Sequence, residues 1–262
     1  MRICNLASGS KGNMTYVEVG STKFLVDIGL SCKEAEKRLA MLGVNPKDID
    51  GILISHEHGD HIRGLETFAC KYGTKVFANS ITWEGLAPKV PKLSIKQQND
   101  FFDDPFSEKE MLVLPFQVSH DTKCCNGFSF IDNKRKASIA TDLGIATENN
   151  LKSLSESSII FLEANHNVDL LKSNVRYPAS LKKRILGNKG HLSNEASGEV
   201  AVRAVRDGAK CIVLSHLSEE NNNPKLAFDS VTNVLTKSGI GPEDVKVAYA
   251  MQDRPTSIFL LK

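Results

Sequence analysis

A six-residue segment rich in histidine constrains this chain more than any other feature. Residues 56–61 read H-E-H-G-D-H, and they directly follow the short apolar run G-I-L-I at residues 51–54. Imidazole and carboxylate groups are the ligands that divalent metals such as zinc prefer. A short apolar run of this kind is typical of a buried strand. The chain is therefore expected to place a metal site at the edge of a sheet.

The spacing within this segment favours two metals rather than one. On a tightly turned segment, His56 and His58 can face one way, while Asp60 and His61 reach a second point nearby. Two metals held close together suit hydrolysis. They lower the pKa of a shared water and stabilise charge on an attacked phosphate or carbonyl.

Three other apolar runs lead to residues of the same chemical type, namely His120, Asp142 and His216. One histidine after a strand is more often a solvated loop residue, but four such strand ends in succession favour a shared centre. The predicted ligands of the first metal are His56, His58 and His120, those of the second metal are Asp60, His61 and His216, and Asp142 bridges both.

The composition of the chain limits the classes of protein to which it can belong. With 262 residues it can bury a large core without disulfides, and its formal charge of +2 is too mild to indicate nucleic-acid binding by itself. The six cysteines contain no C-x-x-C pair, which favours reduced thiols and a cytoplasmic protein. We see neither a signal-peptide pattern nor an apolar run near the roughly 20 residues that a membrane helix needs. The oligomeric state is left open.

Apolar runs with strand character alternate with helical patterns along the whole chain. Sheets packed together with helices outside are therefore expected, and residues 1–262 are expected to form a single domain because neither a repeat nor a linker interrupts them. Strands are predicted at 2–7, 14–19, 23–28, 51–55, 75–78, 111–119, 127–131, 136–141, 158–163 and 210–215, with two more near the end, and helices at 31–42, 61–72, 193–207 and 224–237. A hairpin turn is predicted at 132–134, and residues 96–109 are predicted to be rich in loops.

The order of the predicted ligands resembles that of the metallo-β-lactamase superfamily. Asp27, at the end of an early strand, matches an aspartate of that family that braces the metal cluster rather than binding metal. The resemblance implies an α+β fold, a four-layer αββα sandwich of two mixed β-sheets with helices outside. It also places the metals at one edge of the sheets.

The segments around these ligands resemble the bacterial YycJ (WalJ) proteins more closely. They are L-A-S-G-S-K-G-N at 6–13, S-H-E-H-G-D-H-I-R-G at 55–64, E-A-N-H at 163–166, G-H-L-S-N at 190–194 and L-S-H-L-S at 214–218. This resemblance implies a metal-dependent 5′-to-3′ exonuclease acting on DNA and linked to DNA repair. Only 48 residues separate Asp142 from His191, too few for the β-CASP insertion of larger nuclease relatives.

His191 and Glu163 are predicted to move a proton. The segment G-H-L-S-N resembles the G-H-S-T motif of transfer-RNA 3′-processing enzymes, in which the histidine pairs with a glutamate at a strand end. A leaving oxygen needs a proton, and a histidine oriented by a carboxylate can supply it. The alternative is that His191 only caps the helix that starts near Ser193.

Several polar residues are candidates for substrate contact. Ser8, Ser10 and Asn13 lie in a glycine-rich loop that can cradle a phosphate or form an ordinary turn. His166, Arg176 and Tyr177 are the other candidates, with a solvated loop, a solvated charge or a packing role as the alternatives. Arg184 and Lys189 are weighed in the same way as contacts to a nucleic-acid backbone.

We therefore predict a dinuclear metallohydrolase that cleaves phosphodiesters from DNA 5′ ends by metal-hydroxide attack, with Asp60, His191 and Glu163 as catalytic residues. Nitrogen and oxygen ligands suit zinc, manganese or iron equally. The alternatives are a small-molecule hydrolase acting on a thioester or cyclic phosphodiester, and an RNA-processing nuclease. A third alternative, a non-catalytic regulatory protein that binds metal, is disfavoured by the complete ligand set.

Overall fold

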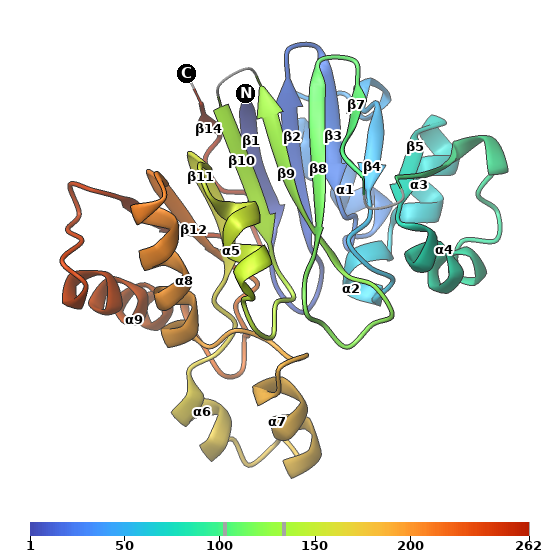
Figure 1. Cartoon of the computed structure of the whole chain (residues 1–262). Helices are drawn as coiled ribbons and strands as arrows, with labels where there is room; N and C mark the ends of the chain where they lie inside the picture. Colours follow the sequence, from blue (N-terminus) through green and yellow to red (C-terminus); the bar gives the residue numbers. More distant parts are fainter. Residues whose placement is uncertain (102–103, 133–134, 262) are drawn as a thin grey trace.

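Two β-sheets packed face to face form the centre of the molecule. The computed structural model describes residues 1–101, 104–132 and 135–261. Across these residues it shows two sheets of seven strands each, with helices on the two outer surfaces (Figure 1). The αββα sandwich predicted from the sequence is confirmed.

Both sheets are mixed, as predicted. The first sheet has the order β14 (Phe259–Leu260), β1 (Arg2–Ala7), β2 (Met14–Val19), β3 (Thr22–Val26), β4 (Gly51–Leu53), β5 (Lys75–Ala78) and β6 (Gln98–Asp100). The second sheet has the order β13 (Lys246–Tyr249), β12 (Cys211–Ser215), β11 (Ile159–Glu163), β10 (Arg135–Ala140), β9 (Asn126–Asp132), β8 (Met111–Gln117) and β7 (Phe106–Glu108). Neighbours from β3 to β6 and from β10 to β13 are parallel, and the others are antiparallel.

The helices connect and cover these strands. The α-helices are α1 (Cys32–Met41), α2 (Gly59–Ile62), α3 (Leu65–Tyr72), α4 (Ser80–Leu86), α5 (Glu148–Leu154), α6 (Val168–Ser173), α7 (Ala179–Leu186), α8 (Asn194–Arg206) and α9 (Pro224–Lys237). Short 3₁₀ helices are η1 (Pro46–Asp48), η2 (Ala87–Lys89) and η3 (Ile95–Gln97). Among the described residues, every helix is too short or too polar to cross a lipid bilayer.

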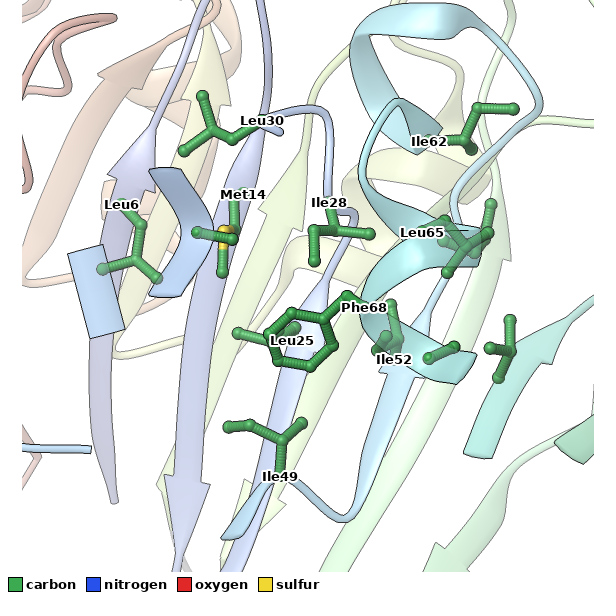
Figure 2. Close-up of a cluster of buried hydrophobic side chains, with 14 of the residues drawn as sticks. Leu6, Met14, Leu25, Ile28, Leu30, Ile49, Ile52, Ile62, Leu65 and Phe68 are labelled. Atoms are coloured by element: carbon green, nitrogen blue, oxygen red, sulfur yellow. The ribbon is translucent and has the colours of Figure 1, made fainter. Parts of the chain in front are cut away.

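The alternation of side chains along the strands explains the layers. In β3, Phe24 and Val26 point into the core between the sheets, whereas Leu25 belongs to the core beneath α1 and α3. Figure 2 shows this outer core, with Leu25 and Ile52 of the sheet facing Phe68 of α3. Burial of each such side chain contributes about 1.5–3 kcal/mol, so both faces of a central strand hold it in place.

Gly64 divides the helix that was predicted as one element over residues 61–72. The amide of Gly64 donates to the carbonyl of Ile28 at 2.9 Å, and a Cβ atom here would lie 2.2 Å from the carbonyl oxygen of Leu30. This close approach leaves no room for a side chain at Gly64, which lies at the junction between α2 and α3. The predicted single helix is thus two helices.

Short or polar elements were missed by the sequence analysis. Residues 96–109 were predicted to be loop-rich, and they contain the edge strands β6 and β7; α4 to α7 were not predicted at all. None of these segments has the long apolar periodicity that reveals an element. Residues 102–103 of the loop and residues 133–134 of the predicted hairpin turn lie outside the described residues.

Candidate metal centre

The candidate site residues converge at one edge of the two sheets. Asp27 follows β3, the H-E-H-G-D-H segment follows β4, Asp142 follows β10 and His216 follows β12. The parallel strands of a sheet end at the same edge, so these residues meet although they are far apart in sequence. The helices α6 and α7 lie just beyond this edge (Figure 1).

Seven side chains form two overlapping groups of possible ligands. The donor atoms of His56, His58 and His120 lie within 4.8 Å of one another, and those of Asp60, His61 and His216 do the same. Asp142 lies between the groups, with Oδ2 3.2 Å from His61 Nε2 and Oδ1 3.6 Å from His120 Nε2. The structure therefore brings together the two ligand sets expected from the sequence.

Buried atoms without hydrogen bonds show that these residues fit a pair of cations. His56 Nε2 and His216 Nε2 are buried and have no hydrogen-bond partner among the described residues. Asp142 Oδ2 also lacks a partner in hydrogen-bond geometry. Leaving such atoms unsatisfied costs about 1–3 kcal/mol each, which a bound cation would remove. The nitrogen and oxygen donors are consistent with a dinuclear centre of divalent metals.

Asp27 and Ser55 orient the histidines from behind. His61 Nδ1 donates to Asp27 Oδ2 at 2.7 Å, which directs His61 Nε2 into the centre. Ser55 donates to both carboxylate oxygens of Asp27, and its hydroxyl lies 3.0 Å from His56 Nδ1. Ser55 was not predicted as a site residue; its position directly before the histidine segment was the only available signal.

One carboxylate, Glu163, contacts two histidines of the site. Its Oε1 accepts from His191 Nδ1 and from His216 Nδ1, both at 2.8 Å. Its Oε2 accepts the backbone amides of Leu143 and Leu192. Burial opposes ionisation, but the two imidazoles outweigh it and hold the pKa of Glu163 at about 2. The pair with His191 was expected, whereas the contact with His216 was not.

The electrostatics of the centre favour bound positive charge. Burial, together with His61, lowers the pKa of His56 well below its ordinary value, so its free Nε2 is a lone-pair donor. For His216, burial acts in the same direction, but Asp142, Asp60 and Glu163 outweigh it and raise its pKa to about 10. Carboxylates that hold a proton on a buried imidazole would stabilise a metal cation in the same place.

Three site residues adopt a backbone conformation that L-amino acids rarely use. Asp27, Asp142 and His216 have φ angles of 58°, 57° and 57°. Asp27 and His216 directly follow a strand and Asp142 stands two residues after one, and the left-handed turn redirects the chain there at the sheet edge. Such residues cost of order 1–3 kcal/mol and persist only where the surroundings determine them. Aspartate and histidine tolerate the region better than most residues.

The first loop of the chain contacts the second ligand group through its backbone and side chains. Ser8 Oγ accepts the amide of His216 at 2.7 Å, and Asn13 Nδ2 lies 3.1 Å from His61 Nε2. The amide of Asn13 donates to the carbonyl of Asp60 at 2.8 Å. Opposite this contact, a Cβ atom at Gly29 would lie 1.6 Å from the same carbonyl oxygen. Ser8 and Asn13 thus support the histidines, while Ser10 is exposed.

A pocket of about 280 Å³ opens beside the centre. Its lining residues are Ser10, His120, Asp121, Asn165, Tyr177, Leu181, Arg184, Ile185, Gly190, His191 and Ser218. Asp121 was missed by the sequence analysis, although it directly follows a predicted ligand. Its Oδ1 lies 3.3 Å from His120 Nε2 and 3.9 Å from His58 Nε2, and its Oδ2 accepts from Arg184 Nε. This carboxylate therefore connects the histidines to α7.

Two of the other predicted substrate contacts do not line this pocket. His166 is 1% exposed and neither of its ring nitrogens has a hydrogen-bond partner. Burial lowers the pKa of its imidazole to about 4. Arg176 is exposed and pairs with Glu220. Tyr177, by contrast, lies on the pocket wall as expected for a substrate contact.

Comparison with known proteins shows the family to which the chain belongs. Residues 7–155 match the Metallo-beta-lactamase superfamily. The chain belongs to this superfamily. Its buried histidine and carboxylate clusters are accordingly those of a superfamily metallohydrolase.

Relatives within the superfamily match nearly the whole chain. The Exodeoxyribonuclease YycJ of Bacillus anthracis is 38% identical over 237 residues, which cover 90% of this chain and 89% of that protein. The Exodeoxyribonuclease WalJ of Streptococcus pneumoniae serotype 2 is 36% identical over 257 residues, covering 97% and 95%. The resemblance to YycJ and WalJ seen in the sequence motifs is confirmed.

Solved structures of the superfamily share the fold. The metallo-beta-lactamase fold protein YhfI from Bacillus subtilis superposes with a TM-score of 0.72 over 98% of this chain and 100% of that one, at 14% identity. The short form of human tRNase Z gives a TM-score of 0.64 over 99% and 100%, at 17% identity. At these identities the likeness concerns the fold alone.

Proposed function

We propose that this protein is a dinuclear metal-dependent phosphodiesterase that removes nucleotides from the 5′ ends of DNA. The observation that carries the hydrolytic part is the convergence of two ligand triads on the Asp142 carboxylate. The choice of DNA is supported by relatives named exodeoxyribonucleases, which match 90–97% of the chain.

Each triad would hold one cation in this proposal. His56, His58 and His120 form the first site, Asp60, His61 and His216 the second, and Asp142 is shared by both. When bound, the two cations lower the pKa of a shared water and offset the charge that develops on an attacked phosphate. Asp27 braces His61, so that the second site keeps its shape.

His191 is the proposed proton donor to the leaving oxygen. It lies on the pocket wall, its side chain is 18% exposed, and Glu163 orients it through Nδ1. Nε2 is thereby free to face a substrate. As the new oxygen–phosphorus bond forms and the old one breaks, the proton on Nε2 passes to the departing alkoxide, so no free alkoxide is released.

End-labelled oligonucleotides test this function directly. The purified protein is incubated with single- and double-stranded DNA and RNA, labelled at either end, in zinc, manganese or magnesium. We expect early release of a labelled mononucleotide from the 5′ end of DNA and none in the presence of a chelator. Cleavage confined to RNA would contradict the choice of DNA. Turnover of a small phosphodiester with no cleavage of any oligonucleotide would overturn the exonuclease proposal and favour a small-molecule hydrolase.

A further inference from the structure

The positive charge of this chain is concentrated in one segment beside the metal centre. Residues 167–190, called the arm below, contain six Lys and Arg residues and one acidic residue. The rest of the chain has 27 Lys and Arg residues against 30 Asp and Glu. The formal charge of +2 therefore conceals a basic arm on a slightly acidic body.

The arm borders the route to the metal centre. It contains α6 and α7, which extend beyond the sheet edge where the candidate ligands meet (Figure 1). Tyr177 and Arg184 of the arm line the 280 Å³ pocket together with His120 and His191. A polymer whose end enters this pocket therefore comes close to these residues of the arm.

The surface of the arm is largely uncovered. The helix α7 has no buried residue, in contrast to α8, which buries seven. Between α6 and α7, Val175 is 97% exposed and stands next to the cation of Arg176. An exposed apolar side chain among cations suits a partner with alternating anionic and apolar surfaces, and an unpaired nucleic-acid strand has phosphates and base faces in this arrangement.

We propose that the arm is the docking surface for the backbone of the strand being degraded. Lys183 and Lys189 are exposed and contact phosphates, while Val175 packs against an unstacked base. This inference rests on the proposed nuclease function and adds to it the face along which the strand reaches the pocket. The body, with its slight excess of acidic residues, would not attract the strand elsewhere.

Two double variants with the same change in charge test the docking surface. The test variant is Lys183→Gln with Lys189→Gln on the arm. The control variant is Lys237→Gln with Lys246→Gln, two exposed residues at the end of α9 and at the start of β13. The metal-loaded protein is titrated with fluorescent single-stranded DNA whose phosphorothioate linkages resist cleavage, at several salt concentrations.

We expect the arm variant to bind about tenfold more weakly and the salt dependence, log Kd against log salt, to flatten by roughly 1.4, since each contact to single-stranded DNA contributes about 0.7. The control variant should keep the wild-type values. Equal losses in both variants, or none in the arm variant, would overturn the proposal. Wild-type binding of the strand without cleavage of unmodified DNA would instead overturn the nuclease function and leave the docking surface standing.

The apolar contact is tested separately. Val175→Ser should weaken strand binding about threefold, and Ile95→Ser, at another exposed apolar residue that is 77% exposed in η3, should not. Both positions are exposed, so neither change endangers folding.

Vesicles of anionic phospholipid test the competing partner, a membrane surface. Arm-dependent binding to the vesicles with no arm dependence toward DNA would overturn the proposal in favour of a membrane surface.

Discussion

The metal centre and the arm are built in opposite ways. In the centre, Glu163 is fully buried and accepts four hydrogen bonds, and three residues have left-handed backbones that the surrounding structure enforces. In the arm, α7 buries no residue, and Arg184 and Arg176 connect it to the body through ion pairs with Asp121 and Glu220. The chemistry therefore depends on a buried, hydrogen-bonded constellation, whereas the proposed substrate contact depends on cations at an exposed surface.

This difference predicts which substitutions are tolerated. Changes on an exposed surface usually alter stability by less than about 0.5 kcal/mol, whereas changes in a buried, hydrogen-bonded network cost several times more. Arm variants should thus alter binding with stability unchanged, and variants in the centre should alter metal binding, activity and stability together.

Asp60→Ala gives the largest expected effect. It removes the only carboxylate of the second triad, so metal-dependent hydrolysis should fall by roughly a thousandfold or more, as is usual when one member of a catalytic unit is lost. Initial rates on end-labelled DNA and the metal content of the purified protein measure this. Asp229→Ala in α9 makes the same change in an exposed carboxylate and should retain activity. Full activity of the Asp60 variant would contradict the two-metal proposal.

Gly29→Ala tests the rigidity of the centre. The added Cβ would meet the carbonyl oxygen of Asp60 at 1.6 Å, so the backbone must move, at an expected cost of about 3 kcal/mol in unfolding free energy. Gly59→Ala, in the histidine segment itself, meets nothing within 4 Å and should be neutral or slightly stabilising. Urea unfolding of both variants checks the pair. Equal unfolding free energies of the two variants would show that the backbone around Gly29 can adapt to a side chain.

Glu163→Gln separates two roles of one side chain. Since Oε1 accepts from both His191 and His216, the amide should impair the second metal site as well as proton transfer. We expect metal affinity to fall about 10–100-fold, in line with other residues that orient ligands. Calorimetric metal titration measures this, with Glu195→Gln, an exposed residue at the start of α8, as the control. Unchanged metal affinity with reduced turnover would show that Glu163 acts through His191 alone.

The pH dependence of stability should reveal the buried His166. Its pKa is about 4 in the folded protein and about 6.5 when unfolded, so the unfolded chain binds more protons between these values. Stability is therefore lost as pH falls from 6.5 toward 4, by about 2 kcal/mol between pH 7 and pH 5. His166→Asn should remove this part of the pH dependence in urea unfolding of chelator-treated protein. An identical slope in variant and wild type would contradict it.

The ligands His120, Asp142 and His216 could be predicted from the sequence because each one stands within three residues of the end of an apolar strand. They are local signals, and the order of the strands in the second sheet then brings them to the same edge. The contact between Asp121 and Arg184 could not be predicted, since it joins residues 63 positions apart through the placement of α7. The same holds for the contact of Glu163 with His216.

The arm shows the corresponding limit for the fold. Its helices are short, with six residues in α6 and eight in α7, so neither gives an apolar periodicity long enough to identify an element. Sequence patterns record burial, so they describe the sandwich well and the arm poorly. The left-handed backbones of the centre were missed for another reason. Aspartate and histidine tolerate this conformation, but where it occurs follows from how the strands leave the sheet.

The left-handed backbone conformations at Asp27 and Asp142, called corners below, also limit how the site can change over evolutionary time. At positions 27 and 142 the backbone admits few residues besides glycine, aspartate and asparagine, and glycine would remove the side chain altogether. Asparagine preserves the corner while removing the charge that attracts a cation. A descendant of this chain that abandoned catalysis but kept its fold is thus expected to carry asparagine at these corners. The identity of residues 27 and 142 in newly sequenced relatives would then distinguish catalytically active members of the family from inactive ones.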